Sequence, residues 1–268
     1  MNKAVVALSF LLFAPLFISA EEELTQEMIL KRIFDKAEHS EKGIDQFGFF
    51  QENIRRELEE DGTITEEEKR VYRTTWIGDQ RYAELIEVNG RGLTEKEKKE
   101  ERKRKQKFLN EVKDKRKELR KEVAIAWKEV YDRYDFERLP AEPGAFYVYS
   151  FLPKNKTLPE RNRTEKVLNH VDGKLWSDEN FNLLRVRATL RESVRFGLGV
   201  LAKLDKLVLD YELQEHENVW LPASIYLKFD ARVALVHRER QETLNRFYDI
   251  FPRPDSAGTP APTSPTQP

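Results

Sequence analysis

Hydrophobic and polar residues alternate along the last third of the chain, between residues 173 and 250. From 182 to 196 the even positions are mostly apolar, and most odd positions carry arginine, serine or threonine. From 207 to 213 and from 221 to 233 the odd positions are apolar, and polar or charged residues occupy most positions between them. A period of two is typical of β-strands with one buried and one solvated face. This block therefore predicts four consecutive long strands of an antiparallel sheet.

The first half of the chain predicts more strands, joined by short turns. Asp61-Gly62 is a good hairpin turn because this pair tolerates positive φ, and Gly78-Asp79 marks a second turn. The segment 164–172 is ambiguous and is interpreted as a strand. With it, the further strands are predicted at 44–58, 64–77, 80–88, 146–152 and 164–172. A sheet of eight or nine strands is expected.

Two segments have the spacing of helices. Residues 24–37 place apolar side chains on one stripe with a period near 3.6. Thr94 and Glu97 fit a capping box that begins a second helix, which Leu139-Pro140 ends. Its first half, 95–107, is almost wholly Glu, Lys and Arg, and it is expected to be solvated and held by near-neighbour ion pairs. Its second half carries an apolar stripe: Phe108, Val112, Leu119, Val123, Trp127, Val130 and Tyr134.

These elements predict an α+β fold in a single domain spanning residues 21–251, with residues 94–136 as a long helical insertion. The segment 252–268 is rich in Pro, Ser, Thr, Gly and Ala without an apolar pattern, so it is predicted to be a disordered tail.

The dry face of the predicted sheet must be covered, and two helices cover little of such a sheet. If the sheet curls, the space left between sheet and helices is an apolar cavity. Periodicity alone does not distinguish this arrangement from a core filled by side chains. The inward candidates for lining a cavity are Trp127, Val186, Ala188, Leu190, Val194, Leu209, Tyr211, Ile225, Leu227 and Phe229.

Residues 1–20 are predicted to be an export signal that is cleaved near Ala20. Lys3 precedes an apolar stretch at 4–17, and small residues precede the acidic run 21–23. The alternative is an uncleaved membrane anchor, which the short stretch and Pro15 disfavour. The chain has no cysteine, which excludes disulfides and an N-terminal lipid-modified cysteine. A bacterial periplasmic protein without a lipid anchor is expected.

Composition and motifs argue against several functional classes. The chain has 47 basic and 48 acidic residues, so its net charge of −1 makes nucleic acid a poor partner. The histidines are scattered without metal-ligand spacing, and no nucleophile motif accompanies the serines. We therefore expect no metal, no cofactor, no catalytic residue and no enzymatic activity.

One segment resembles a known family. Leu175-Trp176-Ser177-Asp178, followed by Leu184-Arg185-Val186-Arg187-Ala188-Thr189-Leu190, is similar to the late-strand pattern of the LolA-like periplasmic carriers that sort outer-membrane lipoproteins. The resemblance implies a strongly curved sheet, an incomplete β-barrel, with helices in its open side. It also implies a non-enzymatic carrier that shields acyl chains. The charged helix is unusually long for that group, and no residue role is carried over.

Two hypotheses follow from the sequence. The first is a periplasmic carrier or binding protein for an amphiphile, such as lipoprotein acyl chains or a lipid, with peripheral contact to a membrane. The second is a non-enzymatic envelope scaffold with a solid core, which would dock on an envelope protein through its charged helix.

Overall fold

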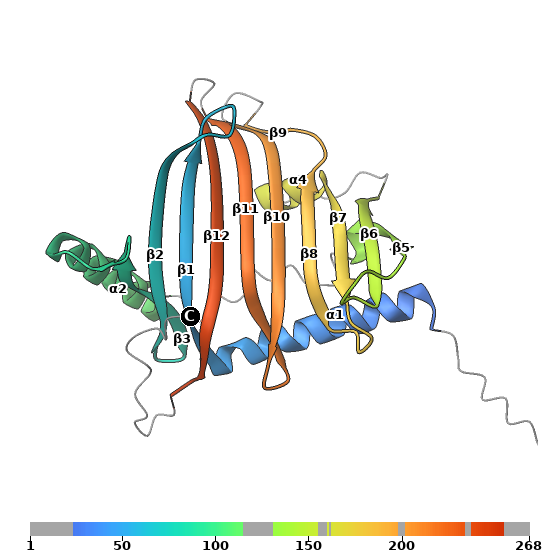
Figure 1. Cartoon of the computed structure of the whole chain (residues 1–268), viewed down its shortest axis with the longest axis horizontal. Helices are drawn as coiled ribbons and strands as arrows, with labels where there is room; N and C mark the ends of the chain where they lie inside the picture. The colour runs from blue at the N-terminus through green and yellow to red at the C-terminus, as the bar shows by residue number, and fades with distance from the viewer. Residues whose placement is uncertain are drawn as a thin grey trace, which may run out of the picture.

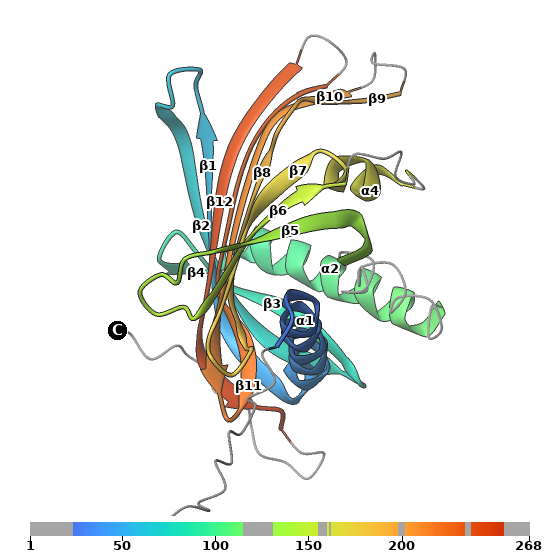
Figure 2. The same cartoon turned by 90° about the vertical axis from the view of Figure 1, so that its right-hand side faces the viewer.

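The computed structural model describes residues 24–114, 131–154, 160, 162–197, 202–233 and 237–254. Its strands form one twelve-stranded antiparallel sheet that is curved and open, not closed into a barrel. The helices lie on one side of this sheet (Figures 1 and 2). We call the side that carries the helices the inner face and the other side the outer face. The predicted α+β class with an open, curved antiparallel sheet is confirmed.

The order of the strands across the sheet is β4-β3-β2-β1-β12-β11-β10-β8-β7-β6-β5, and β9 pairs with β10. The first and last long strands therefore lie side by side, and Phe47–Glu57 of β1 pairs with Gln241–Pro252 of β12. The bounds are β1 Phe47–Leu58, β2 Ile64–Ile77, β3 Gln80–Val88, β4 Arg91–Gly92, β5 Tyr134–Leu139, β6 Tyr147–Pro153, β7 Val171–Ser177, β8 Leu183–Leu190, β9 Val194–Phe196, β10 Ala202–His216, β11 Val219–Val233 and β12 His237–Pro252.

Helix α1, Gln26–Gly43, crosses the strands on the inner face (Figure 1). Thr25 caps its start, because the Thr25 side chain accepts a hydrogen bond from the Met28 N–H at 3.3 Å. The stripe Ile29, Leu30, Ile33 and Phe34 is buried against Tyr147 and Tyr149 of β6, Leu175 of β7 and Leu183 of β8. Burying a side chain of this kind gains about 2 kcal/mol, so this stripe fixes α1 on the sheet.

The other helical segments are η1 (Ile44–Gln46), α2 (Glu95–Asp114) and α4 (Arg163–Leu168). Val167 of α4 packs on a second cluster with Tyr134, Phe151, Val171 and Ala188. A third cluster, Phe50, Val71 and Phe251, joins β1, β2 and β12. Much of the long central strands β10 and β11 lies outside these clusters.

Several expectations need correction. The sheet has twelve strands and not eight or nine. The segment predicted as a strand at 164–172 begins with helix α4, whose cap Asn162 accepts a hydrogen bond from the Glu165 N–H at 2.9 Å. The insertion predicted as helical to 136 turns into strand β5 at Tyr134, where Tyr134 and Phe136 alternate with acidic residues. Tertiary pairing with β6 stabilises this strand against the helical pattern that precedes it.

Other expected segments lie partly or wholly outside the described residues. The export signal at 1–20 and the apolar second half of the long helix, including Trp127, are among them. The predicted tail starts later than expected, because Pro252 still belongs to β12 and the backbone N–H of Arg253 donates to the Gln46 carbonyl at 2.7 Å. No helix in the described part of the chain is long and apolar enough to cross a membrane.

Gly173 makes a direct test of the packing between β7 and β8. A Cβ at this position would overlap the Arg187 carbonyl oxygen and lie 2.6 Å from the Phe151 ring. We expect Gly173→Ala to lower the free energy of unfolding in urea by about 2 kcal/mol or more, since backbone must shift. Gly92→Ala is the matched control, because nothing lies within 4 Å of its added Cβ. Equal stability of the two variants would show that β7 and β8 are not paired in this way.

Candidate functional site

The inner face is organised in rows of directly paired residues that run across the strands. Side chains of paired residues point to the same face of a sheet. One row passes beneath α1 at its apolar end and consists of Tyr149, Leu175, Val186, Tyr211, Ile225, Asn245, Asn53, Arg70 and Val88. The next row consists of Phe136, Phe151, Gly173, Ala188, Leu209, Leu227, Thr243, Arg55 and Glu68.

Each row changes from apolar to polar between β11 and β12. Ile225 pairs with Asn245, Leu227 with Thr243, and Phe229 with Gln241. Charged residues follow at the next strands, because Thr243 pairs with Arg55 and Gln241 with Glu57. The inner face therefore passes from apolar to neutral polar and then to charged within a few strand spacings.

We call the apolar region that adjoins the α1 contact the inner apolar patch, and Val186 lies where the two meet. Its residues come from β8, β10 and β11, and each is half-buried: Val186, Leu190, Leu207, Leu209, Tyr211, Ile225, Leu227 and Phe229. Ile225, Leu227 and Phe229 belong to none of the described clusters of buried side chains. In the part of the chain that the structure describes, this surface is therefore incompletely covered, although α1 and α4 flank it (Figure 1).

The structure places most of the residues that the sequence predicts to line a cavity on one face of the sheet. The strands bring nine of them onto the inner face, and Trp127 lies outside the described residues. Ala188 and Val194 are 8% and 1% exposed, so they are packed side chains of the core. The other seven belong to the inner apolar patch. Leu207 completes the patch, and its position in the alternating pattern of β10 would have identified it.

Burial also acts on the one hydroxyl group of the patch. The pKa of Tyr211 is raised to about 12, first by desolvation and then by the carboxylate of Glu41 on α1. Its hydroxyl is thus neutral at ordinary pH, and the patch carries no charge of its own.

Uncharged polar side chains border the patch on β12 and β1. The Asn245 Oδ1 accepts hydrogen bonds from the Gln51 Nε2 and the Asn53 Nδ2, both at 2.8 Å. The Gln241 Nε2 donates to the Thr243 Oγ1 at 2.8 Å. We call these five residues the neutral strip. The alternation of apolar residues along the chain does not predict the neutral strip, because the strip depends on the pairing of β1 with β12.

A hollow of about 210 Å³ lies at the charged end of the inner face, between β2, β3 and α2. Its walls combine acidic, basic and apolar side chains: Glu68, Arg70, Tyr72, Leu85, Val88, Glu97, Glu100, Glu101 and Arg104. The Arg70 Nε and the Glu68 Oε2 form an ion pair at 2.9 Å. On β1 the Arg55 guanidinium lies 3.3 Å from the Glu57 carboxylate. The arginines of this region are therefore already neutralised.

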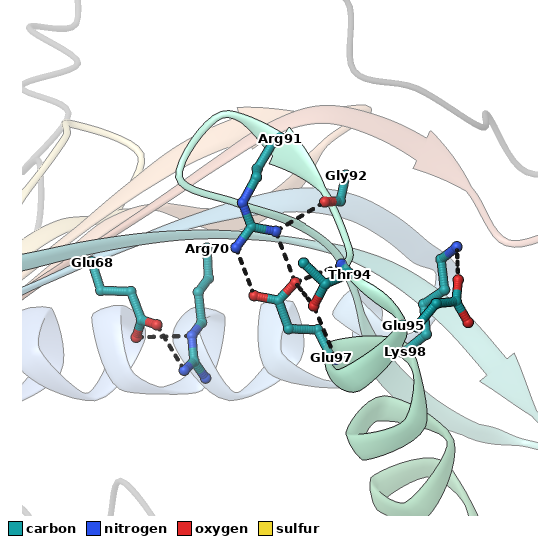
Figure 3. A network of polar contacts seen from close by, with 8 residues as sticks. All are labelled: Glu68, Arg70, Arg91, Gly92, Thr94, Glu95, Glu97 and Lys98. Carbon is teal, nitrogen blue, oxygen red and sulfur yellow. Dashed lines mark hydrogen bonds and ion pairs between the residues drawn. The ribbon is translucent and has the colours of Figure 1, made fainter.

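The first turn of α2 is fixed by a polar network (Figure 3). The Thr94 N–H donates to the Glu97 carboxylate at 2.7 Å, and the Glu97 N–H donates to the Thr94 Oγ1 at 3.3 Å. This reciprocal pair is the capping box that the sequence predicts. Arg91 adds two hydrogen bonds to Glu97, at 2.8 and 3.0 Å.

Further along α2, one acidic residue is buried in contact with β3. Glu101 is 8% exposed and accepts hydrogen bonds from the Tyr82 hydroxyl at 2.7 Å and the Arg104 Nε at 2.8 Å. Burial and this hydrogen bond raise the pKa of Tyr82. The guanidinium of Arg104 also lies 4.8 Å from the centre of the Tyr82 ring. The sequence predicts a solvated helix here, whereas the structure anchors one face of it on the sheet.

A second hollow, of about 410 Å³, lies over β6, β7 and β8. The Trp176 indole at its rim donates to the Glu142 carboxylate at 2.7 Å. The other polar side chains that line this hollow are already in contact with other groups of the protein: Ser150, Asp172, Lys174, Arg187 and Thr189. This hollow therefore has few groups left with which to hold a ligand.

Among the described residues, no group of three or more His, Asp or Glu side chains could hold a metal ion. The inner face offers apolar contact on β8, β10 and β11 and hydrogen-bonding groups on β12 and β1.

No family model matches the chain, and no curated protein matches it. Among solved structures, the crystal structure of a DUF1329 family protein from Desulfovibrio piger is 11% identical to this chain. The match covers 86% of this chain and 95% of that chain, with a TM-score of 0.30. A likeness this weak supports no conclusion about the fold or the function of this protein.

The capping network predicts an unusual titration. The pKa of Glu97 is lowered to about 2, first by Arg91 and then by Thr94. Because this pKa lies below the usual value of 4.5, the contacts stabilise the start of α2 above about pH 4.5. This stabilisation is lost as the pH falls toward 2 and the Glu97 carboxylate is protonated. Carbon NMR of the carboxyl group should show the pKa of Glu97 rising toward 4.5 in Arg91→Ala. It should stay near 2 in Lys98→Ala, since Lys98 pairs with Glu95. An unchanged pKa in Arg91→Ala would contradict the network.

Proposed function

We propose that this protein is a carrier or binding protein for an amphiphile, whose apolar chain lies on the inner apolar patch. One observation carries the proposal: a continuous row-ordered apolar surface on β8, β10 and β11 is only half-buried, although it faces the side that holds the helices. Contiguous apolar surface of this kind commonly marks a binding site, because leaving it in water is unfavourable.

The free energy gained by burying an alkyl chain is large enough to bind such a ligand. Burying an alkyl chain gains about 0.8 kcal/mol for each methylene, so a chain of twelve carbons gains roughly 9 kcal/mol before the cost of ordering it. An open sheet leaves a route for the chain to enter and leave sideways. Binding with easy release is what a carrier needs.

The sequence supports the same proposal from a different direction. The resemblance of residues 175–190 to LolA-like carriers favours lipoprotein acyl chains or a lipid as cargo. The predicted export signal favours the periplasm, where such cargo must be shielded from water. Non-enzymatic transfer agrees with an inner face that offers apolar contact and hydrogen bonds.

Two leucines on opposite faces of neighbouring strands give a matched test. Leu227 lies in the inner apolar patch, whereas Leu244 of β12 points to the outer face, and both are half-buried. We expect Leu227→Gln to weaken binding of a fluorescent fatty acid at least ten-fold, because a polar group would then contact the chain. Leu244→Gln should leave the dissociation constant unchanged. Urea unfolding of both variants checks that they are folded, and equal dissociation constants would refute the proposed site.

A second candidate function rests on the exposed side of α2. Its buried Glu101 faces the sheet, whereas Lys96, Lys99 and Lys103 are exposed at spacings of three and four residues. These three lysines form no ion pair with a described residue. The exposed side is thus basic, which favours a docking module for an acidic surface in the cell envelope.

Anionic vesicles provide the simplest acidic surface with which to test this docking function. Each basic residue near such a surface contributes about 1 kcal/mol. The triple variant Lys96→Glu, Lys99→Glu and Lys103→Glu should therefore bind vesicles containing phosphatidylglycerol at least ten-fold more weakly in co-sedimentation. Lys31→Glu on α1 is the control. If the wild-type chain does not sediment with these vesicles, or the triple variant sediments equally, the basic side of α2 is not a membrane-docking surface.

A further inference from the structure

We propose that the amphiphile carries an uncharged headgroup rich in hydroxyl or amide groups, and that the neutral strip selects it. This inference rests on the proposed function, since the inner apolar patch must hold the chain. It adds the chemical class of the ligand, which the patch alone does not define.

The position of the neutral strip is the first reason to expect that it binds the headgroup. Ile225, Leu227 and Phe229 form the edge of the inner apolar patch, and their partners on β12 are Asn245, Thr243 and Gln241. Neighbouring strands lie about 4.8 Å apart. A chain that lies on β10 and β11 therefore places a headgroup on β12 and β1, within one or two strand spacings.

The hydrogen-bonding capacity of the strip is the second reason. The Asn245 Oδ1 already accepts two hydrogen bonds, but its Nδ2 donates none to a described residue. The Gln51 Oε1 and the Asn53 Oδ1 likewise accept none from the described part of the chain. The strip thus offers both a donor and acceptors. Hydroxyl and amide groups can use both, whereas an ionised carboxylate or phosphate only accepts and a quaternary ammonium does neither.

The charges next to the strip are the third reason. Arg55 lies 3.3 Å from Glu57 and 4.0 Å from Glu239, and Arg70 is paired with Glu68. An anionic headgroup would have to compete with these carboxylates for each arginine. Since Glu66 adds a further negative charge in the same region, the local field opposes an anion.

Three ligands with the same chain and different headgroups test the inference: monolauroylglycerol, laurate and lauroylcholine. Each would displace a neutral fluorescent probe from the full-length protein at pH 8, below its critical micelle concentration. We expect monolauroylglycerol to bind at least ten-fold tighter than laurate or lauroylcholine. Equal binding of all three, or tighter binding of either charged ligand, would overturn the inference while leaving the proposed function intact. Failure of all three to bind would overturn both.

Substitutions in the neutral strip test whether the strip causes the preference for an uncharged headgroup. Asn245→Leu should weaken binding of monolauroylglycerol and spare laurate, so that the ratio of their dissociation constants falls below about three-fold. Thr243→Val removes one hydroxyl with little change of shape, and it should reduce the same ratio even if Asn245→Leu fails to fold. Asn110→Leu on the exposed side of α2 is the control and should keep the ratio of the wild-type protein. An unchanged ratio in both strip variants would show that the strip does not select the headgroup.

Discussion

The antiparallel pairing of β1 with β12 decides what the inner face of this protein presents. It joins the first strand of the chain to the last, and so sets Asn53 beside Asn245 in the row that holds Ile225 and Tyr211. The Gln51 side chain reaches the same Asn245 from the neighbouring inner-face position of β1. Without that pairing, β12 would be an edge strand and β1 to β4 would not belong to the same sheet. With it, one surface carries apolar, neutral polar and charged regions in sequence.

Helices α1 and α2 cover opposite ends of the inner face and leave its middle less covered by the described residues. Helix α1 buries its apolar stripe against β6, β7 and β8, where large aromatic side chains meet it. Helix α2 is held at the other end by Glu97, Glu101 and their partners on the first turn and on β3. Between these two anchors lie the inner apolar patch and the neutral strip, whose side chains are half-buried. Chemistry that suits an amphiphile therefore lies where coverage by the described residues is least complete.

Local patterns in the sequence predicted much of this fold. The bounds of β2 and β3, the capping box at Thr94 and the faces of β8, β10 and β11 all follow from period and turn chemistry. The expected stripe of α1 is confirmed at Ile29, Ile33 and Phe34 but not at Met28, which is exposed. The errors at β5 and α4 arose in short segments, where tertiary pairing and an Asn162 cap outweigh a weak pattern. The neutral strip was not predicted, since no local signal indicates that residues almost 200 positions apart are paired. Seven of the ten proposed lining residues lie in the inner apolar patch because alternation alone assigns a face.

The central claim is that an alkyl chain lies on the inner apolar patch. A photoactivatable fatty acid, cross-linked to the protein and mapped by peptide mass spectrometry, tests it most directly. Labelling should concentrate on β10 and β11 at inner-face positions such as Leu209, Leu227 and Phe229, and excess monolauroylglycerol should suppress it. Labelling confined to the outer face, or spread evenly over the chain, would contradict the account.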